Sequence, residues 1–305
     1  MDAIQKSLLE AVADLHEIPT GAYNIRANGQ SVGRASSEHV EIVPKEGGKG
    51  IDIYIKEGTK NESVHIPVVL SQSGLTEMVY NDFHIGKDCD VTIIAGCGIH
   101  NSGDADSKHD GIHTFYLEEN AKIKYVEKHY GSGDGNGQRV MNPETVCHLG
   151  KNSYMEMETV QIKGVDSTIR KTIADLAEGA TLTVTERLMT HGSQIAESQF
   201  DVSLDGDDSG AHVVSRSVAR DQSKQVFISK INGNAKCNGH TECDAIIVGN
   251  ANISAIPEIT ANNSDAALVH EAAIGKIAGE QIIKLMTLGL TQEEAEEEII
   301  NGFLK

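Results

Sequence analysis

The sequence predicts a mainly β protein whose core is a solenoid, most simply a parallel β-helix, with a short helix before it and a helical hairpin after it. Between about residues 25 and 260, short segments of alternating apolar and polar residues, such as IDIYI and TLTVTERL, are separated by Gly, Asn, Asp and Ser. No helical pattern separates these strands, which disfavours a βαβ fold, and the two-residue Asn-Gly or Asp-Gly turns of hairpins are few. Aromatic residues make up 4% of the chain and Trp is absent, which suits narrow, repetitive layers.

Residues 1–24 are predicted to form an N-terminal helical segment. Its apolar residues recur at helical spacing: Ile4, Leu8, Val12 and Leu15. Asp2 stands where a helix N-cap is expected, and Pro19 and Gly21 end the pattern. The segment has neither the apolar region nor the small-residue cleavage pattern of a signal peptide, so we expect a cytoplasmic protein.

Residues 25–262 are predicted to form the β-helix, because one short strand-and-turn unit repeats imperfectly along them. A small residue after a turn cluster opens many of these units: Ser153, Ser167, Ala180, Ser198, Ala211, Ser223, Ala235 and Ala251. Successive members of this set lie 12 to 18 residues apart, and Cys89 and Ala121 precede Ser153 by two intervals of 32 residues, about two units each. An irregular β-sandwich is the alternative that the repetition leaves open.

Residues 263–305 are predicted to end the chain as a helical hairpin. The stretch GEQIIKLMTLG has an apolar helix face made of Ile282, Ile283 and Met286. Gly289 suits the residue that follows a helix end. The next stretch, TQEEAEEEIINGFL, opens with the capping-box spacing of Thr291 and Glu294, so two short helices joined near Gly289 are expected.

The formal net charge is −19, from 26 basic and 45 acidic residues. Such a surface repels phosphate groups, so nucleic acid and anionic membranes are not expected as partners. No run approaches the roughly 18 apolar residues of a membrane-spanning helix. The five cysteines, an odd number, argue in a reducing compartment for free thiols or metal ligands rather than a disulfide framework.

The stretch CNGHTECDA contains two candidate metal ligands, Cys237 and Cys243. In one extended strand they would lie roughly 20 Å apart, too far to share an ion. A turn at Asn238-Gly239 would instead let Cys243 begin the next strand, with Glu242 pointing to the opposite side. The alternative is that both cysteines are small core residues.

Two histidine-containing stretches are further candidates. His270 and Glu271 lie where the repeats give way to the helices, either as a surface pair or as donors beside a metal. The segment 97–113 contains His109 and His113, which could share a metal if helical, but a solvated loop is the favoured interpretation. It does not fit a calcium-binding loop, and no phosphate-binding loop of the GxxxxGK[ST] type occurs in the chain.

The ordered series ECDAIIVGN, PEIT, HEAAIGKI and GLTQEEAEEEIINGFL resembles the C-terminal core of the SufB/SufD family of iron–sulfur cluster assembly scaffolds. The resemblance is strong over residues 235–305 and looser from about residue 65. It implies a right-handed parallel β-helix, a C-terminal helical domain that docks on a SufC-like ABC-type ATPase, and a transient iron–sulfur cluster at a subunit interface. By position in these motifs, Cys243, His270 and Glu271 match the family's metal or sulfur ligands, and Cys237 is a lesser candidate.

The chain lacks the long N-terminal extension of the larger members of this family, so it resembles the short archaeal and anaerobic branch. That resemblance implies a homodimer paired through the β-helix with two ATPase subunits, served by a sulfur donor and apo-protein acceptors, and a scaffold with no catalysis of its own. ATP binding by the partner would then rearrange the interface and expose Cys243. The alternatives are a carbohydrate-active β-helix using Asp205, Asp207 and Asp208, or a purely structural β-helix.

Overall fold

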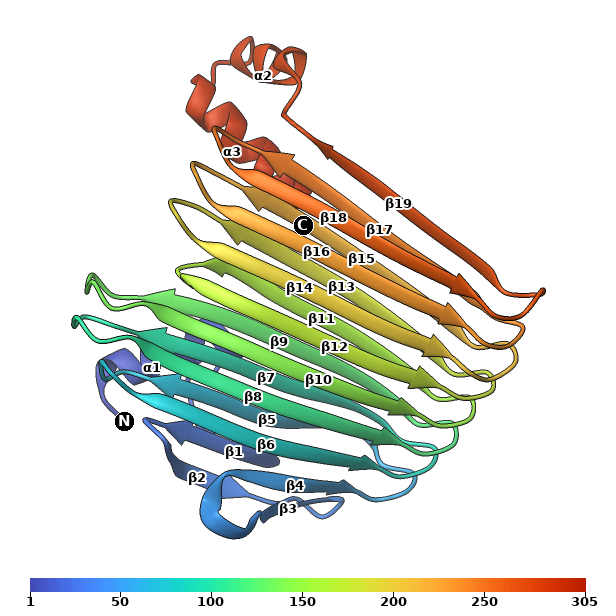
Figure 1. Cartoon of the computed structure of the whole chain (residues 1–305). Helices are drawn as coiled ribbons and strands as arrows, with labels where there is room; N and C mark the ends of the chain where they lie inside the picture. The colour runs from blue at the N-terminus through green and yellow to red at the C-terminus, as the bar shows by residue number, and fades with distance from the viewer.

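The computed structural model describes residues 1–305 as a β-solenoid of about eight turns with helices at both ends (Figure 1). Each turn adds one strand to each of two sheets. In sheet order, the ten-stranded sheet contains β19 (Ala267–Gly275), β17 (Asn238–Ile247), β15 (Gly210–Ala219), β13 (Thr181–Thr190), β11 (Tyr154–Lys163), β9 (Lys122–Ser132), β7 (Asp90–His100), β5 (Lys60–Leu70), β1 (Ala22–Ala27) and β2 (Gln30–Ala35). The nine-stranded sheet contains β18 (Asn252–Ala261), β16 (Lys224–Gly233), β14 (Ile195–Leu204), β12 (Ser167–Leu176), β10 (Arg139–Leu149), β8 (Ser107–Leu117), β6 (Thr76–Ile85), β4 (Gly50–Ile55) and β3 (Val40–Pro44). The predicted solenoid is confirmed.

Strand pairing is parallel throughout, except where β1 meets β2 and β3 meets β4 at the N-terminal end. From β4 onward, strands that pair directly are 27 to 32 residues apart in sequence, so one full turn is twice the unit expected from the repeats. Alternate residues of each strand point inward and form one apolar core of 37 residues that extends along the solenoid. This alternation is the pattern from which the strands were predicted.

A column of small residues occupies one corner of the solenoid. Its members are at most 1% exposed: Cys89, Ala121, Ser153, Ala180, Ser209 and Cys237. The carbonyl of each accepts a hydrogen bond of 2.8–3.0 Å from the first amide of the equivalent strand in the next turn. In five of these turns the preceding residue is Asp, Asn or Gly in the left-handed conformation, with φ of 55–67°. The corner therefore needs a sharp bend followed by a side chain too small to obstruct the next turn.

The helices lie against opposite ends of the stack. Helix α1 (Ala3–Ala13) begins with the expected cap at Asp2 and packs on β5, β7 and β9. It lies so close to β7 that a Cβ atom at Gly96 would be 2.3 Å from the backbone oxygen of Val12. Helices α2 (Gly279–Met286) and α3 (Gln292–Phe303) form the predicted C-terminal hairpin, and a 3₁₀ turn spans Glu46–Gly48. No helix is both long and apolar enough to cross a membrane.

Three expectations differ from the structure. The solenoid does not end at residue 262, because β19 lies within the span assigned to the C-terminal helices, and β1 begins before residue 25. Ser198 is the fourth residue of β14 and does not open a unit. Ser167 and Ala211 lie at the starts of strands, β12 and β15, so the predicted set mixed corner and strand positions. The segment 97–113 is mostly strand, because its histidines continue the inward alternation of β8.

The corner column generates a stability prediction. Ala180→Leu inserts a branched side chain where neighbouring turns contact each other, so we expect the free energy of unfolding to fall by about 1–3 kcal/mol. Equilibrium unfolding in urea measures the change. Ala105→Leu, at an exposed turn residue, is the matched control and should change stability by less than about 0.5 kcal/mol. Equal stability of the two variants would contradict the role assigned to the corner.

Candidate metal-binding site on the last two turns

The candidate ligands lie on β17 and β19, the last two strands of the ten-stranded sheet. Thr241 pairs with His270, and Cys243 pairs with Ala272. Paired residues of parallel strands point to the same face, about 4.8 Å apart, and successive residues alternate between faces. Cys243 and His270 therefore face the interior of the solenoid, whereas Glu271 faces outward.

The inward-facing group combines a thiol with an imidazole. His270 Nδ1 lies 2.6 Å from the hydroxyl oxygen of Thr241, while its Nε2 is buried and has no hydrogen-bond partner. Burial, and then the nearby His240, lower the pKa of His270. The ring is consequently neutral near pH 7, the form in which imidazole binds metals.

The thiol of Cys243 is buried, at 1% exposure, and forms part of the main core. Burial, followed by the charges of Glu186 and Asp244, raises its pKa to about 12. Glu186 lies two strands away in the same inward column and accepts hydrogen bonds from Ser198 and Ser215 at 2.6 and 2.7 Å. The family resemblance implied a thiol at a subunit interface, whereas within one chain Cys243 lies in the core.

The outward-facing group contains nitrogen and oxygen donors. One donor atom from each of His240, Glu242 and Glu271 lies within 4.8 Å of the other two, and the His240 Nε2 to Glu271 Oε2 distance is 3.5 Å. A hydrogen bond with Asp244, together with burial, raises the pKa of Glu242. This surplus of negative charge beside an imidazole suits a divalent cation. His240 and Glu242 were not predicted as ligands, although their spacing of two residues in a strand places them on one face.

The structure separates Cys237 from Cys243. No turn occurs at Asn238-Gly239, because β17 begins there and continues to Ile247. The two cysteines therefore lie at opposite positions of one extended segment, roughly 20 Å apart. Cys237 occupies the small-residue corner, as Cys89 does five turns earlier, and the corner explains its burial without a ligand.

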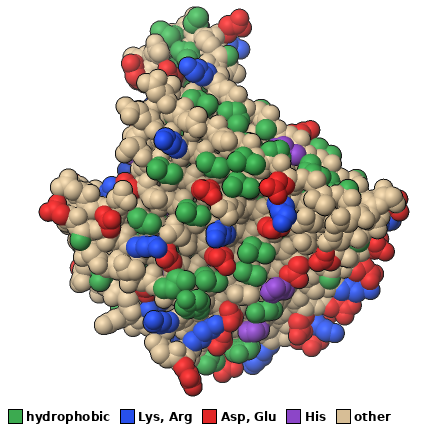
Figure 2. Space-filling model, viewed as in Figure 1, with side chains coloured by type: hydrophobic (Ala, Val, Ile, Leu, Met, Phe, Trp, Pro, Cys, Tyr) green, Lys and Arg blue, Asp and Glu red, His purple; other side chains and the backbone are tan.

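The acidic cluster considered for carbohydrate chemistry has structural partners. Asp205, Asp207 and Asp208 lie in one turn, where Asn234 and Lys236 bind them at 2.6–3.1 Å. On the face shown in Figure 2, Lys and Arg side chains are scattered among acidic ones and form no basic patch.

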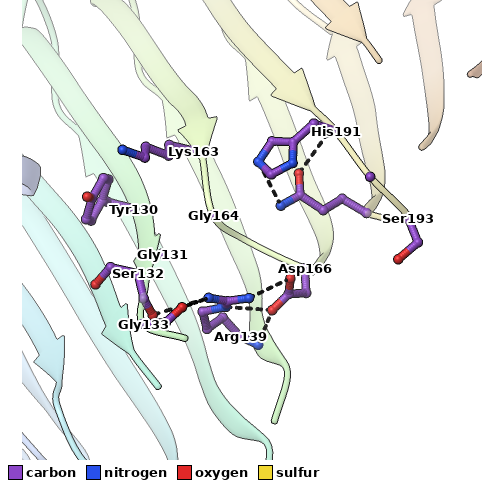
Figure 3. A pocket seen from close by; sticks show the side chains of 12 residues that line it. Tyr130, Gly131, Ser132, Gly133, Arg139, Lys163, Gly164, Asp166, His191 and Ser193 are labelled. Carbon is purple, nitrogen blue, oxygen red and sulfur yellow. Dashed lines mark hydrogen bonds and ion pairs between the residues drawn. The ribbon is translucent and has the colours of Figure 1, made fainter. Parts of the chain in front are cut away.

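An open cavity of about 510 Å³ lies where β9, β11 and β13 end (Figure 3). On one side of it the guanidinium of Arg139 lies beside the carboxylate of Asp166, with an Nε to Oδ2 distance of 2.7 Å. The cavity contains no thiol, and its lining residues are distinct from those of the last two turns.

Comparison with known proteins identifies the family that the chain matches. Residues 70–303 match the family model described as SUF system FeS cluster assembly, SufBD core domain. An iron–sulfur cluster assembly SufBD family protein of Methanocaldococcus jannaschii is 26% identical over 255 residues, which cover 83% of this chain and 79% of the relative. A relative from Pyrococcus horikoshii, described in the same words, is 28% identical over 263 residues, covering 85% and 78%. One from Archaeoglobus fulgidus is 28% identical over 231 residues, covering 75% and 61%.

The environment of Cys243 predicts low reactivity. In the isolated folded chain at about pH 8, its alkylation by iodoacetamide should be at least about a hundredfold slower than in urea, because burial and a raised pKa suppress the thiolate. Mass spectrometry of the alkylated peptide after timed quenching measures the rate. Equal rates in the folded and unfolded chain would show that the final turn does not protect the thiol.

Proposed function

Because the chain belongs to the SufBD family of iron–sulfur cluster assembly proteins, we propose that it is the scaffold subunit on which a nascent cluster is built and from which it is transferred. The observation that supports this function is the register of β17 and β19. It places a thiol and an imidazole with one unpartnered nitrogen on one face, and a carboxylate-rich group on the other, beside the open end of the solenoid.

The donors suit a cluster that must be given away. A thiolate at Cys243 is the soft ligand that the iron of a cluster favours, whereas the imidazole of His270 and the carboxylate of Glu271 are weaker ligands for iron. His240, Glu242 and Glu271 would hold ferrous iron on the outer face before the cluster is assembled. Transfer would then replace these ligands with the thiolates of an apo-protein acceptor.

Access to Cys243 requires the final turn to move. The strand β19 pairs with β17 on one side only, and β18 is likewise the edge strand of its sheet. Both edges carry exposed apolar side chains: Ile256, Ile259, Val269 and Ile274. Unpaired edge strands with apolar side chains are suited to pairing with another chain, so we assign this end to a homodimer interface.

The C-terminal hairpin suits an ATPase partner. Helix α3 is anchored, because Ile300 and Leu304 pack against Val218 of β15, and partly buried Ile246 of β17 joins the same cluster. Helix α2 buries none of its residues and projects from the stack (Figure 1). A partner that displaces α2 would therefore move α3, which contacts β17 at Ile246. Ile246 lies three residues after Cys243 in the sequence. This chain has no phosphate-binding loop, so the ATP would be bound by the partner.

The ligand assignment predicts loss of cluster. When the chain is co-expressed with its ATPase and purified without oxygen, Cys243→Ser and Glu271→Ala should each reduce bound iron and acid-labile sulfide roughly tenfold, as loss of a ligand or its orienting partner does elsewhere. Iron and sulfide assays with absorption spectra provide the measurement. Cys147→Ser, which alters another fully buried thiol, is the control and should retain the cluster. Wild-type iron and sulfide in both variants would remove the assignment.

The proposed role of α2 in docking predicts that ATPase binding can be lost without loss of stability. Ile283→Ser combined with Met286→Ser should abolish co-purification with the ATPase without lowering Tm, because both side chains are exposed on α2. Ile169→Ser, at a similarly exposed apolar position on β12, is the matched control and should bind normally. Retained binding in the α2 variant would favour a solenoid that docks some other partner.

A further inference from the structure

The last turn of the solenoid is held less firmly than the turns before it. It consists of β18, β19 and the loop between them, and none of residues 252–275 is buried. Strand β19 pairs with β17 on one side and has no neighbour beyond it (Figure 1). A segment with few buried side chains and a single pairing partner opens at a lower free energy than the interior of a fold. Strand β19 is therefore readily displaced from β17.

The carboxylates of the outer face lie one register position from the thiol. Glu242 pairs with Glu271, and the next residue of each strand forms the pair that contains Cys243. Because side chains alternate between faces, the two carboxylates lie outside the solenoid and the thiol lies inside it. An ion that joins Glu242 to Glu271 would therefore hold β19 in place directly over the thiol.

The three donors of the outer face converge from two strands. His240 and Glu242 belong to β17, Glu271 belongs to β19, and one donor atom of each lies within 4.8 Å of the other two. The Nε2 atom of His240 has no hydrogen-bond partner and lies 3.5 Å from Glu271 Oε2. The side chains of His240 and Glu271 are 34% and 63% exposed, so the group is open to ions from solvent.

The charge around these donors favours a cation. Asp244 forms a hydrogen bond with Glu242 and brings a third carboxylate to the group, whereas Arg216, the register partner of Asp244 on β15, supplies one positive charge. Two negative charges therefore remain in excess, and one divalent ion neutralises them. Carboxylate ligands suit hard divalent ions such as Mn²⁺, and imidazole suits Fe²⁺.

We propose that a divalent ion bound by His240, Glu242 and Glu271 fastens β19 to β17 and thereby keeps Cys243 covered. The ion loses its Glu271 ligand whenever β19 is displaced, so it binds the closed turn more tightly than the open turn. Because linked equilibria are reciprocal, displacement of β19 weakens the binding of the ion as the thiol becomes accessible. This gate rests on the proposed scaffold function, in which the ion is ferrous iron and Cys243 is a cluster ligand. Iron held on the outer face and an exposed thiol are then alternative states of the last turn.

Alkylation of the isolated chain with and without Mn²⁺ tests the gate. Mn²⁺ is the probe because it favours carboxylates over thiolates, so a slower reaction does not reflect a metal bound to the sulfur. Reduced, metal-free protein is treated with iodoacetamide without oxygen, and mass spectrometry gives the rates at Cys243 and Cys147. We expect saturating Mn²⁺ to slow the alkylation of Cys243 about tenfold, a usual size for coupling between linked sites. The rate at Cys147, which is fully buried on β10, should not change.

Variants of the donors connect the protection to the site. His240→Ala and Glu271→Gln should each weaken Mn²⁺ binding, measured by electron paramagnetic resonance, by more than about tenfold and abolish the protection of Cys243. Glu258→Gln removes an exposed carboxylate from β18 in the same turn, so it is the matched control and should retain both. Circular dichroism and Tm without metal establish that each variant folds.

Two results would overturn the proposal. Mn²⁺ that binds without slowing the alkylation of Cys243, or that slows Cys147 equally, would show that the ion does not fasten the last turn. Absence of saturable binding that depends on His240 and Glu271 would remove the site itself. Neither measurement requires the ATPase or an assembled cluster, so these results would leave the scaffold function standing, and that function is tested separately by the retention of iron and sulfide.

Discussion

The parallel, in-register pairing of successive turns is the constraint on which the rest of the molecule depends. Each turn must return the chain to the same register, so residues 27 to 32 positions apart become direct neighbours. One such column in the ten-stranded sheet runs Glu127, Thr159, Glu186, Ser215, Cys243 and Ala272. The chemistry at any point is therefore set by the turns before and after it, as the influence of Glu186 on the pKa of Cys243 shows.

Features that depend on neighbouring residues could be predicted from the sequence. Alternation within strands, the cap of α1 at Asp2 and the capping box of Thr291 and Glu294 are all local, and each is present in the structure. The inward direction of Cys243 and the outward direction of Glu242 also follow from alternation alone. Local rules were sufficient for these features because no distant contact competes with them.

Features that depend on pairing between turns could not be predicted in the same way. The polar composition of segment 97–113 indicated a solvated loop, yet His109 and His113 lie on a buried strand because other polar side chains surround them. The grouping of His240 with Glu271 arises between strands whose register the sequence does not reveal. Cys237 and Cys243 look alike locally, but only the stacking of turns assigns one to a corner and the other to a column beside the open end.

The buried ion pairs of the interior, such as Arg26 with Glu77, are not explained by stability, because replacing a buried ion pair with well-packed apolar residues is often neutral or stabilising. Access to buried side chains depends instead on where they lie along the stack. Cys97 on β7 is enclosed by several turns on each side. Cys243 is covered by a single edge strand that has no partner on its outer side. Displacing one strand breaks far fewer contacts than opening the stack, and a site that must release its metal is therefore best placed at the last turn.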